Sequence, residues 1–229
     1  MANSDVDPLE WARQHTPILQ QLATECADSS VFSGYRIAVN SHLEAKTGVL
    51  IETLAAGGAE VLVTGSEPYS TGGAVVDALS RNDRIRLFVE ADMDEPSWIA
   101  GQHEVLSASS DLILDDGCEL IAKAHADQPT VVDKVMGATE QTTAGIHRLE
   151  AMEDGHQLRF PVYGVNDTPM QHRFDNVHGT GESALANVMM TTNTILSGTR
   201  VAGWGRVGRV SLGPTTEDRG FPLDICNSR

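Results

Sequence analysis

The chain of 229 residues carries 32 Asp and Glu against 16 Lys and Arg, and 41% of its residues are hydrophobic. This length and apolar content predict a globular protein with one large domain, or with one domain and part of another. The formal net charge of -16 argues against a nucleic acid or an anionic membrane as partner, because both attract basic surfaces.

The first predicted element is a helix over residues 9–26, where apolar residues recur three and four apart and Pro17 introduces a break or kink. Short apolar runs then alternate with helical patterns. The runs that predict strands are YRIAVN, AEVLVTGS, IRLFVE, DLILDD, VVDKVMGATE and PVYGVND. Continuously apolar strands that alternate with helices indicate an α/β fold, a doubly wound parallel sheet covered on both faces.

Polar residues follow five of these strands, and in a doubly wound sheet such positions line the ligand crevice. Each set by itself is better explained by a turn or a helix cap than by a binding site. Five sets at one sheet edge indicate a binding site. The sets are Asn40, Ser41 and His42; Ser70 and Thr71; Asp115 and Asp116; Thr139 to Thr143; and Asn166 to Asn176.

The last of these sets belongs to VNDTPMQHRFDN, residues 165–176, which we interpret as a polar strand end. After a helical run, TRVAGWGRVGR predicts a short strand that enters a Gly-x-Gly-x-x-Gly turn at Gly203, Gly205 and Gly208. A strand before this pattern is typical of a dinucleotide pyrophosphate loop. The helix that should follow is not predicted, because Gly213-Pro214 stands where it would run.

The remaining sequence features concern compartment and redox state. Cys26, Cys118 and Cys226 are odd in number and far apart, so we expect reduced thiols and neither a disulfide nor a metal site. No run approaches ~18 apolar residues and the N-terminus lacks a signal-peptide pattern, so we expect a soluble cytoplasmic protein. The acidic surface, with only three lysines, fits a halophilic cytoplasm, where charges are screened within ~3 Å at ~1 M salt. An ordinary acidic protein is the alternative.

Six motifs in one unbroken order resemble the adenosylhomocysteinase (S-adenosyl-L-homocysteine hydrolase) family, in a haloarchaeal-like form. They are HLEAKTGVLIETLAAGGAEV, the loop at Ser70 and Thr71, DDGCEL, GATEQTTAGIHRLEAM, VNDTPMQHRFDNVHGTGES and GWGRVG, and they cover about residues 10–209. The resemblance implies reversible NAD-dependent hydrolysis of S-adenosyl-L-homocysteine to adenosine and homocysteine, a step of one-carbon metabolism. It also implies a small-molecule nucleoside substrate and a homo-oligomer.

The resemblance further implies a division into three parts. We predict a substrate-binding α/β domain over residues 1–181 and, over residues 182–209, a linker helix with the first strand and glycine loop of an incomplete Rossmann NAD domain. Residues 210–229 are predicted to be an unrelated, disordered tail, because the similarity ends abruptly after Arg209. This pattern is that of a truncated or frameshifted member of the family.

The family's functional residues carry over position by position. Catalytic positions are His42, Asp116, Asp175 and Gln171, the last at the position of the family's lysine. Substrate-binding positions are Glu44 and Gln141, the latter at the position of the family's glutamate. Cofactor-binding positions are Thr142, Thr143, Ala144, Asn176, Gly203, Gly205 and Gly208.

Two of these positions weigh most against catalysis. Gln171 has no ammonium group to stabilise an alkoxide or donate a proton, and Gln141 lacks the charge of a carboxylate acceptor. Losing a general acid or base typically slows a reaction by about 10²–10⁴-fold. We therefore predict that the chain is inactive. The alternatives are a non-catalytic nucleoside-binding remnant and a decayed gene product.

Overall fold

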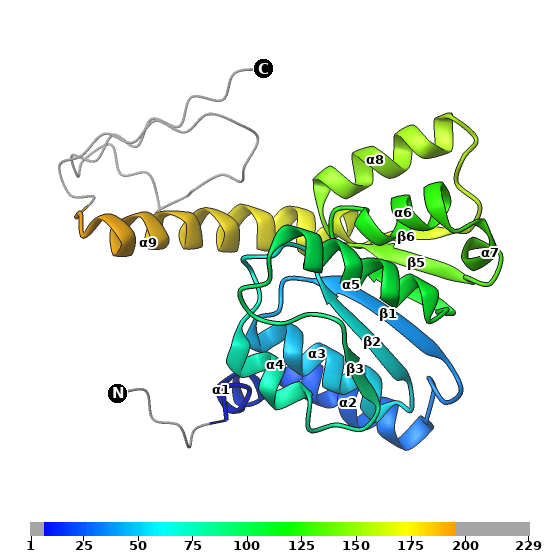
Figure 1. The fold of residues 1–229 in the computed structure, drawn as a ribbon. Coiled ribbons are helices and arrows are strands. Elements are labelled where there is room, and N and C mark those ends of the chain that lie inside the picture. Colours follow the sequence, from blue (N-terminus) through cyan, green and yellow to red (C-terminus); the bar gives the residue numbers. More distant parts are fainter. Residues whose placement is uncertain (1–6, 196–229) are drawn as a thin grey trace. The chain divides into compact units, whose positions relative to one another are not determined.

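The computed structural model describes residues 7–195. The described chain forms two compact units, the first ending at Gly164 and the second beginning at Val165. Figure 1 follows the chain through the strands and helices of both units. The glycine turn predicted at Gly203, Gly205 and Gly208, and the predicted tail over residues 210–229, lie outside the described residues.

The first unit is built on a six-stranded sheet in the order β3-β2-β1-β4-β5-β6, in which every neighbouring pair is parallel. This arrangement confirms the predicted α/β fold with a parallel sheet. The strands are β1 Arg36–Ser41, β2 Glu60–Gly65, β3 Ile85–Leu87, β4 Leu112–Asp115, β5 Gly137–Glu140 and β6 Val162–Gly164.

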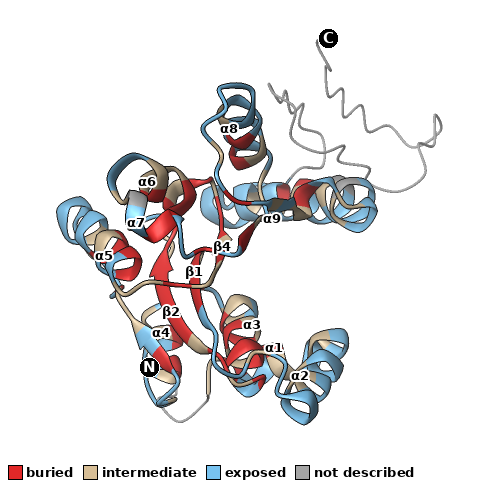
Figure 2. Ribbon diagram, turned by 90° about the vertical axis from the view of Figure 1, so that its right-hand side faces the viewer, coloured by how far each residue is buried: buried red, intermediate tan, exposed pale blue. Residues whose placement is uncertain are grey.

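Helices cover both faces of this sheet (Figure 2). In β1, Ile37 and Val39 belong to the core that contains α1, α3 and α4, whereas Ala38 belongs to the core that contains α5 to α8. Successive strand residues therefore bury apolar side chains in opposite layers, which explains why the strands are continuously apolar. The helices are α1 Glu10–His15, α2 Pro17–Ser29, α3 Ala45–Ala56, α4 Gly73–Leu79, α5 Glu95–Ser107, α6 Glu119–Asp127, α7 Pro129–Val132 and α8 Thr143–Asp154.

The structure confirms the break that Pro17 predicts in the first helical stretch. Thr16 has φ −121° and ψ 65°, outside the helical region, and Pro17 is the first residue of α2. Proline suits the first helical position because its missing N–H would have no partner there. The sequence marks this break with a single residue.

Three strand predictions were wrong in extent. The run IRLFVE, residues 85–90, forms β3 only as far as Leu87. The run VVDKVMGATE begins with the last residues of the short helix α7, and β5 starts only at Gly137. The strand predicted over PVYGVND ends at Gly164, and Val165–Asp167 form a 3-10 turn. VNDTPMQHRFDN is therefore not a polar strand end. Instead, Gln171–Gly179 is a π-helix that continues into α9, Thr180–Thr192, within the second unit.

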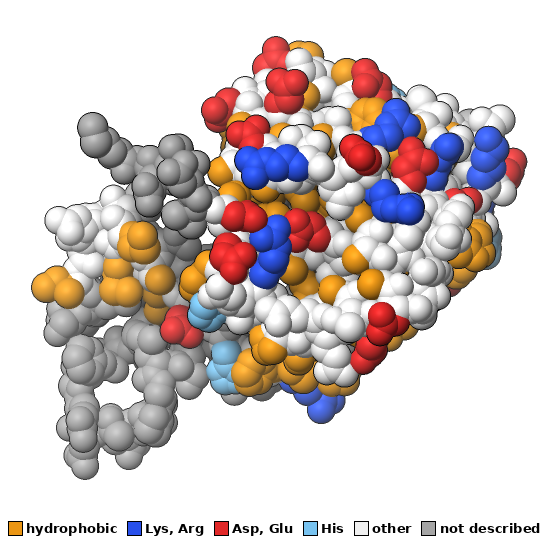
Figure 3. All heavy atoms as spheres, turned by 90° about the horizontal axis from the view of Figure 1, so that it is seen from below, with side chains coloured by type: hydrophobic (Ala, Val, Ile, Leu, Met, Phe, Trp, Pro, Cys, Tyr) orange, Lys and Arg blue, Asp and Glu red, His pale blue; other side chains and the backbone are white. Residues whose placement is uncertain are grey.

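Most of the arginines on the first unit have carboxylate partners. Arg13 lies 2.7 Å from a Glu52 oxygen, and Arg36 and Arg86 lie 2.8 and 3.3 Å from the two oxygens of Glu60. Hydrogen bonds from Arg36 and, to a smaller extent, from Arg86 lower the pKa of the Glu60 carboxyl. Figure 3 shows basic side chains lying beside acidic ones on the face it presents. This interspersed surface differs from the contiguous basic patch of a nucleic-acid-binding protein.

We predict that Gly101→Ala destabilises the first unit. A Cβ at Gly101, in α5, would overlap the backbone carbonyl oxygen of Phe88. Because a backbone atom cannot rotate away, α5 must shift, at a cost of about 1–3 kcal/mol in the free energy of unfolding. Urea denaturation followed by circular dichroism measures this cost. The control is Ser107→Ala, which also introduces an alanine into α5 but at an exposed position. Its free energy of unfolding should stay within about 0.5 kcal/mol of the wild-type value. Equal stability of both variants and the wild type would contradict the prediction.

Candidate functional site

Three buried polar side chains form a row across the carboxyl ends of neighbouring strands. Asn40 lies in β1, Asp115 ends β4 and Glu140 ends β5, and their exposed fractions of 0%, 3% and 0% remove all three from solvent. Asn40 Nδ2 donates a hydrogen bond to Asp115 Oδ1 at 2.7 Å, and Asp115 and Glu140 are register partners. The strand order reverses between β1 and β4, which is where open α/β sheets bind ligands. The row therefore lies at the expected crevice.

Asp115 holds the start of α6 rather than facing a ligand. Its Oδ2 accepts a hydrogen bond from the Ile121 backbone amide at 2.9 Å, and its Oδ1 accepts one from the Asp116 amide at 3.0 Å. Burial raises the pKa of Asp115 to about 6, and the nearby charge of Glu140 acts in the same direction. The amide donors oppose this shift because they stabilise the carboxylate.

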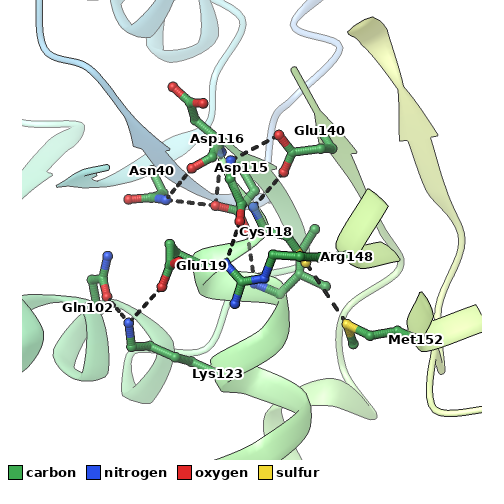
Figure 4. A network of polar contacts seen from close by, with 12 residues as sticks. Asn40, Gln102, Asp115, Asp116, Cys118, Glu119, Lys123, Glu140, Arg148 and Met152 are labelled. Carbon is green, nitrogen blue, oxygen red and sulfur yellow. Dashed lines mark hydrogen bonds and ion pairs between the residues drawn. The ribbon is translucent and has the colours of Figure 1, made fainter. Parts of the chain in front are cut away.

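Glu140 contacts the backbone of two loops, and Figure 4 shows its carboxylate directed at the loop that carries Cys118. Its Oε1 accepts hydrogen bonds from the amides of Gly117 at 3.0 Å and Thr142 at 2.8 Å, and its Oε2 accepts one from the Cys118 amide at 2.8 Å. Burial is the main cause of the raised pKa of Glu140. Glu140 belongs to the predicted polar set Thr139 to Thr143, but no role was predicted for it from the sequence.

Three of the predicted site residues meet beside this row. Asp116 Oδ2 accepts a hydrogen bond from Gln141 Nε2 at 2.6 Å and lies 3.5 Å from His42 Nε2. The Asp116 side chain is 9% exposed and the His42 side chain 40%, so the cluster reaches from the protein interior to solvent. Because a carboxylate only accepts, the Gln141 amide nitrogen faces Asp116 and its oxygen faces away. The cluster thus combines a carboxylate, an imidazole and an amide oxygen.

The other predicted positions of the first unit surround this cluster. Glu44 is exposed and precedes α3, while Thr142 is the N-cap residue of α8, followed by the exposed residues Thr143 and Ala144. The loop after β2 is tied to the end of β1, because the Leu43 amide donates to the Ser70 carbonyl at 3.1 Å and Leu43 forms a parallel bridge with Thr71. Four of the five predicted polar strand ends therefore belong to one edge of the sheet.

The fifth set lies in the second unit, where three amide side chains form a chain. Gln171 Nε2 donates to Asn176 Oδ1 at 3.4 Å, and Asn176 Nδ2 donates to Asn166 Oδ1 at 3.2 Å. Asp175 is exposed and lies in the same π-helix. Gln171, which the resemblance predicts to stand at the position of the family's lysine, thus makes a neutral amide contact with Asn176.

Comparison with known proteins decides the family. The model of the S-adenosyl-L-homocysteine hydrolase family matches residues 2–130 and 119–202. The chain belongs to this family. The resemblance stated from the sequence motifs is confirmed. Within residues 7–195, no helix is long and apolar enough to cross a membrane, and no group of three or more His, Cys, Asp or Glu side chains could hold a metal ion.

Curated relatives agree with the family match. The chain is 43% identical over 203 residues to adenosylhomocysteinases of Haloquadratum walsbyi and Halobacterium salinarum, covering 88% of its own length. It is 41% identical over 205 residues to an S-inosyl-L-homocysteine hydrolase of Methanopyrus kandleri, covering 89% of its own length. The chain spans about half the length of these relatives, 47% or 48% of each.

We predict that Asp115 makes the free energy of unfolding fall as pH rises from about 4 to 6. Its pKa is 3.8 when unfolded and about 6 when folded, so in this window the folded chain holds a proton that the unfolded chain has released. A difference of about two pH units corresponds to roughly 3 kcal/mol. Urea denaturation from pH 4 to 7.5 should show the wild-type advantage over Asp115→Asn shrinking as pH rises.

The control for these pH-dependent unfolding measurements is a second Asp→Asn variant. Asp77→Asn removes an exposed carboxylate from α4 and should keep the wild-type pH profile. Asp115→Asn should also be less stable than the wild type at pH 4, because its amide cannot accept from all three N–H donors that face Asp115. Parallel pH profiles for the wild type and Asp115→Asn would contradict the assignment.

Proposed function

We propose that the chain binds the nucleoside part of S-adenosyl-L-homocysteine, or adenosine itself, at the cluster of His42, Asp116 and Gln141, and that it hydrolyses this substrate slowly or not at all. The observation that carries the proposal is the meeting of these three side chains at the switch point of the sheet, in a chain of this family. A small, polar, neutral ligand also suits a chain whose net charge is -16, because it meets no repulsion.

The chemistry of the cluster suits ribose hydroxyls. The Asp116 carboxylate accepts hydrogen bonds from hydroxyl donors, and bonds to an ionised acceptor are the stronger kind. The Gln141 amide oxygen adds a second acceptor, directed away from Asp116. His42 can donate or accept, according to its tautomer. Hydroxyl recognition needs this mixture of acceptors and one adaptable group.

The proposed loss of turnover rests on two amides. Gln171 makes its contact with Asn176 through an uncharged Nε2, so it offers neither an ammonium nor a transferable proton to a developing alkoxide. Gln141 gives a hydrogen bond to Asp116 where a glutamate would place a second negative charge. The site can therefore hold a nucleoside with less acid and base chemistry than the reaction requires.

The family cofactor NAD fits the described residues only in part. When bound, it would supply reversible hydride transfer with the ribose 3′ carbon. Of the described residues assigned to it, Thr142 fits best, because its hydroxyl makes no cap bond at the start of α8. Ala144 has no polar side-chain atom, and the Asn176 amide already contacts Asn166 and Gln171. The described residues therefore fit NAD only partly. The cytoplasmic, high-salt setting and the oligomer stay predictions.

We predict that the purified chain, incubated with S-adenosyl-L-homocysteine and NAD in concentrated salt, releases adenosine at least about 10²-fold more slowly than an active enzyme, which is the lower bound for losing one general acid or base. Chromatography of the nucleoside products measures the rate. The Halobacterium salinarum relative, assayed in parallel, is the positive control. Adenosine release at the rate of this relative would refute the proposed inactivity.

We predict that the chain nevertheless binds adenosine and that Asp116→Asn weakens this binding by roughly 10-fold to 100-fold, as expected for loss of a charged hydrogen-bond acceptor. Isothermal titration calorimetry with adenosine, and with inosine for comparison, measures both affinities. Asp77→Asn removes a carboxylate from the surface of α4 and should leave the affinity unchanged. No binding by the wild type, or equal binding by Asp116→Asn, would contradict the proposed site.

A further inference from the structure

Glu140 joins two loops that carry ligand-facing residues. Its carboxylate bonds to the amides of Gly117 and Cys118, after β4, and to the amide of Thr142, after β5. Asp116 directly precedes Gly117, and Gln141 directly precedes Thr142. One buried side chain therefore anchors the residue next to each of the two side chains that meet at 2.6 Å. Moving the carboxylate would move both.

The neighbouring helix is shaped to leave room for this carboxylate. Gly145, in the first turn of α8, packs so closely on Glu140 that an added Cβ would overlap the carboxyl group. Glycine is required here by close approach, not by its backbone angle. The sequence thus places a glycine where a larger residue would displace the carboxylate from its three amide donors.

A second tie joins the same helix and the same loop. Arg148, one turn further along α8, donates from Nη1 to the Gly117 carbonyl oxygen at 2.7 Å and lies 2.6 Å from a Glu119 oxygen. Its side chain is 45% exposed, so water screens this ion pair. Glu140 is fully buried and unscreened, so its bonds are the stronger constraint on the loop.

We propose that Glu140 is a positioning residue of the nucleoside site, which sets the distance between Asp116 and Gln141 through the backbone of their two loops and does not itself touch the ligand. This inference rests on the proposed function. It deepens that proposal by naming what holds the two ligand-facing side chains together. An amide at this position cannot replace the carboxylate, because its NH₂ group would face backbone N–H donors.

The test compares Glu140→Gln with Ile51→Val. Ile51 is buried in α3, in the hydrophobic core that does not contain α6 or α8, so this change lowers stability in the other layer of the unit. Backbone hydrogen exchange followed by NMR reports on the amides of Gly117, Cys118 and Thr142. In Glu140→Gln we expect exchange at least 10-fold faster at one or more of these amides, and adenosine affinity at least 10-fold lower. Ile51→Val should change neither quantity by more than about twofold.

The two readouts separate failure of this inference from failure of the proposed function. If the wild type binds no adenosine, the proposed function fails, while hydrogen exchange still tests whether Glu140 holds the loops. Unchanged exchange in Glu140→Gln would overturn the positioning role, as would faster exchange with unchanged adenosine affinity. Should Glu140→Gln not fold, Glu140→Asp keeps the charge on a shorter side chain. It should show the same two losses to a smaller extent, and wild-type values for Glu140→Asp would also overturn the role.

Discussion

The hydrogen bond from the Asn40 amide to the Asp115 carboxylate joins β1 to β4 at the place where the strand order reverses. From this bond the polar row continues to Glu140, and the two carboxylates hold the loops before α6 and α8. The side chains that reach solvent at this edge, His42 and Gln141, are placed relative to these loops. The site therefore depends on buried polar groups that do not themselves face the crevice.

The unfavourable free energy of burying the neighbouring carboxylates of Asp115 and Glu140 must be offset by other interactions. Removing a carboxylate from water costs several kcal/mol, and proximity adds repulsion between Asp115 and Glu140. Each carboxylate accepts three N–H bonds, and a bond to an ionised group contributes about 1.5–3 kcal/mol. The start of α6 adds the favourable field of a helix N-terminus. The pKa of Asp115 near 6 records the remaining cost of burial.

The sequence predicts most of the fold because its signals are local. Continuously apolar runs identified the strands, Pro17 marked a helix break, and the polar residues after β1, β4 and β5 indicated the edge at which we propose that the ligand binds. Local signals failed at VNDTPMQHRFDN, where polar residues after a short strand form a 3-10 turn and a π-helix. They failed also at VVDKVMGATE, where Val131 and Val132 lie in a helix and not in a strand.

The role of Glu140 could not be read from sequence for a different reason. Its partners Gly117 and Cys118 lie 23 and 22 residues away, and only the register of β4 with β5 brings them together. One signal in the sequence could have suggested this role. Glu140 ends a predicted strand, as Asp115 ends another, and Gly145 follows Glu140 by five residues. The resemblance to the family instead singles out the next residue, Gln141. It predicts that this glutamine replaces a glutamate, with the loss of one negative charge.

We propose that the carboxyl edge of β1, β4 and β5 binds a nucleoside. The most direct measurement is an NMR titration of the isotopically labelled chain with adenosine, followed through backbone amide shifts. We expect the largest changes at residues 40–44, 115–118 and 140–144. Changes centred on the opposite edge of the sheet, at Arg36, Asp111 and Met136, or no changes at saturating adenosine, would contradict this account.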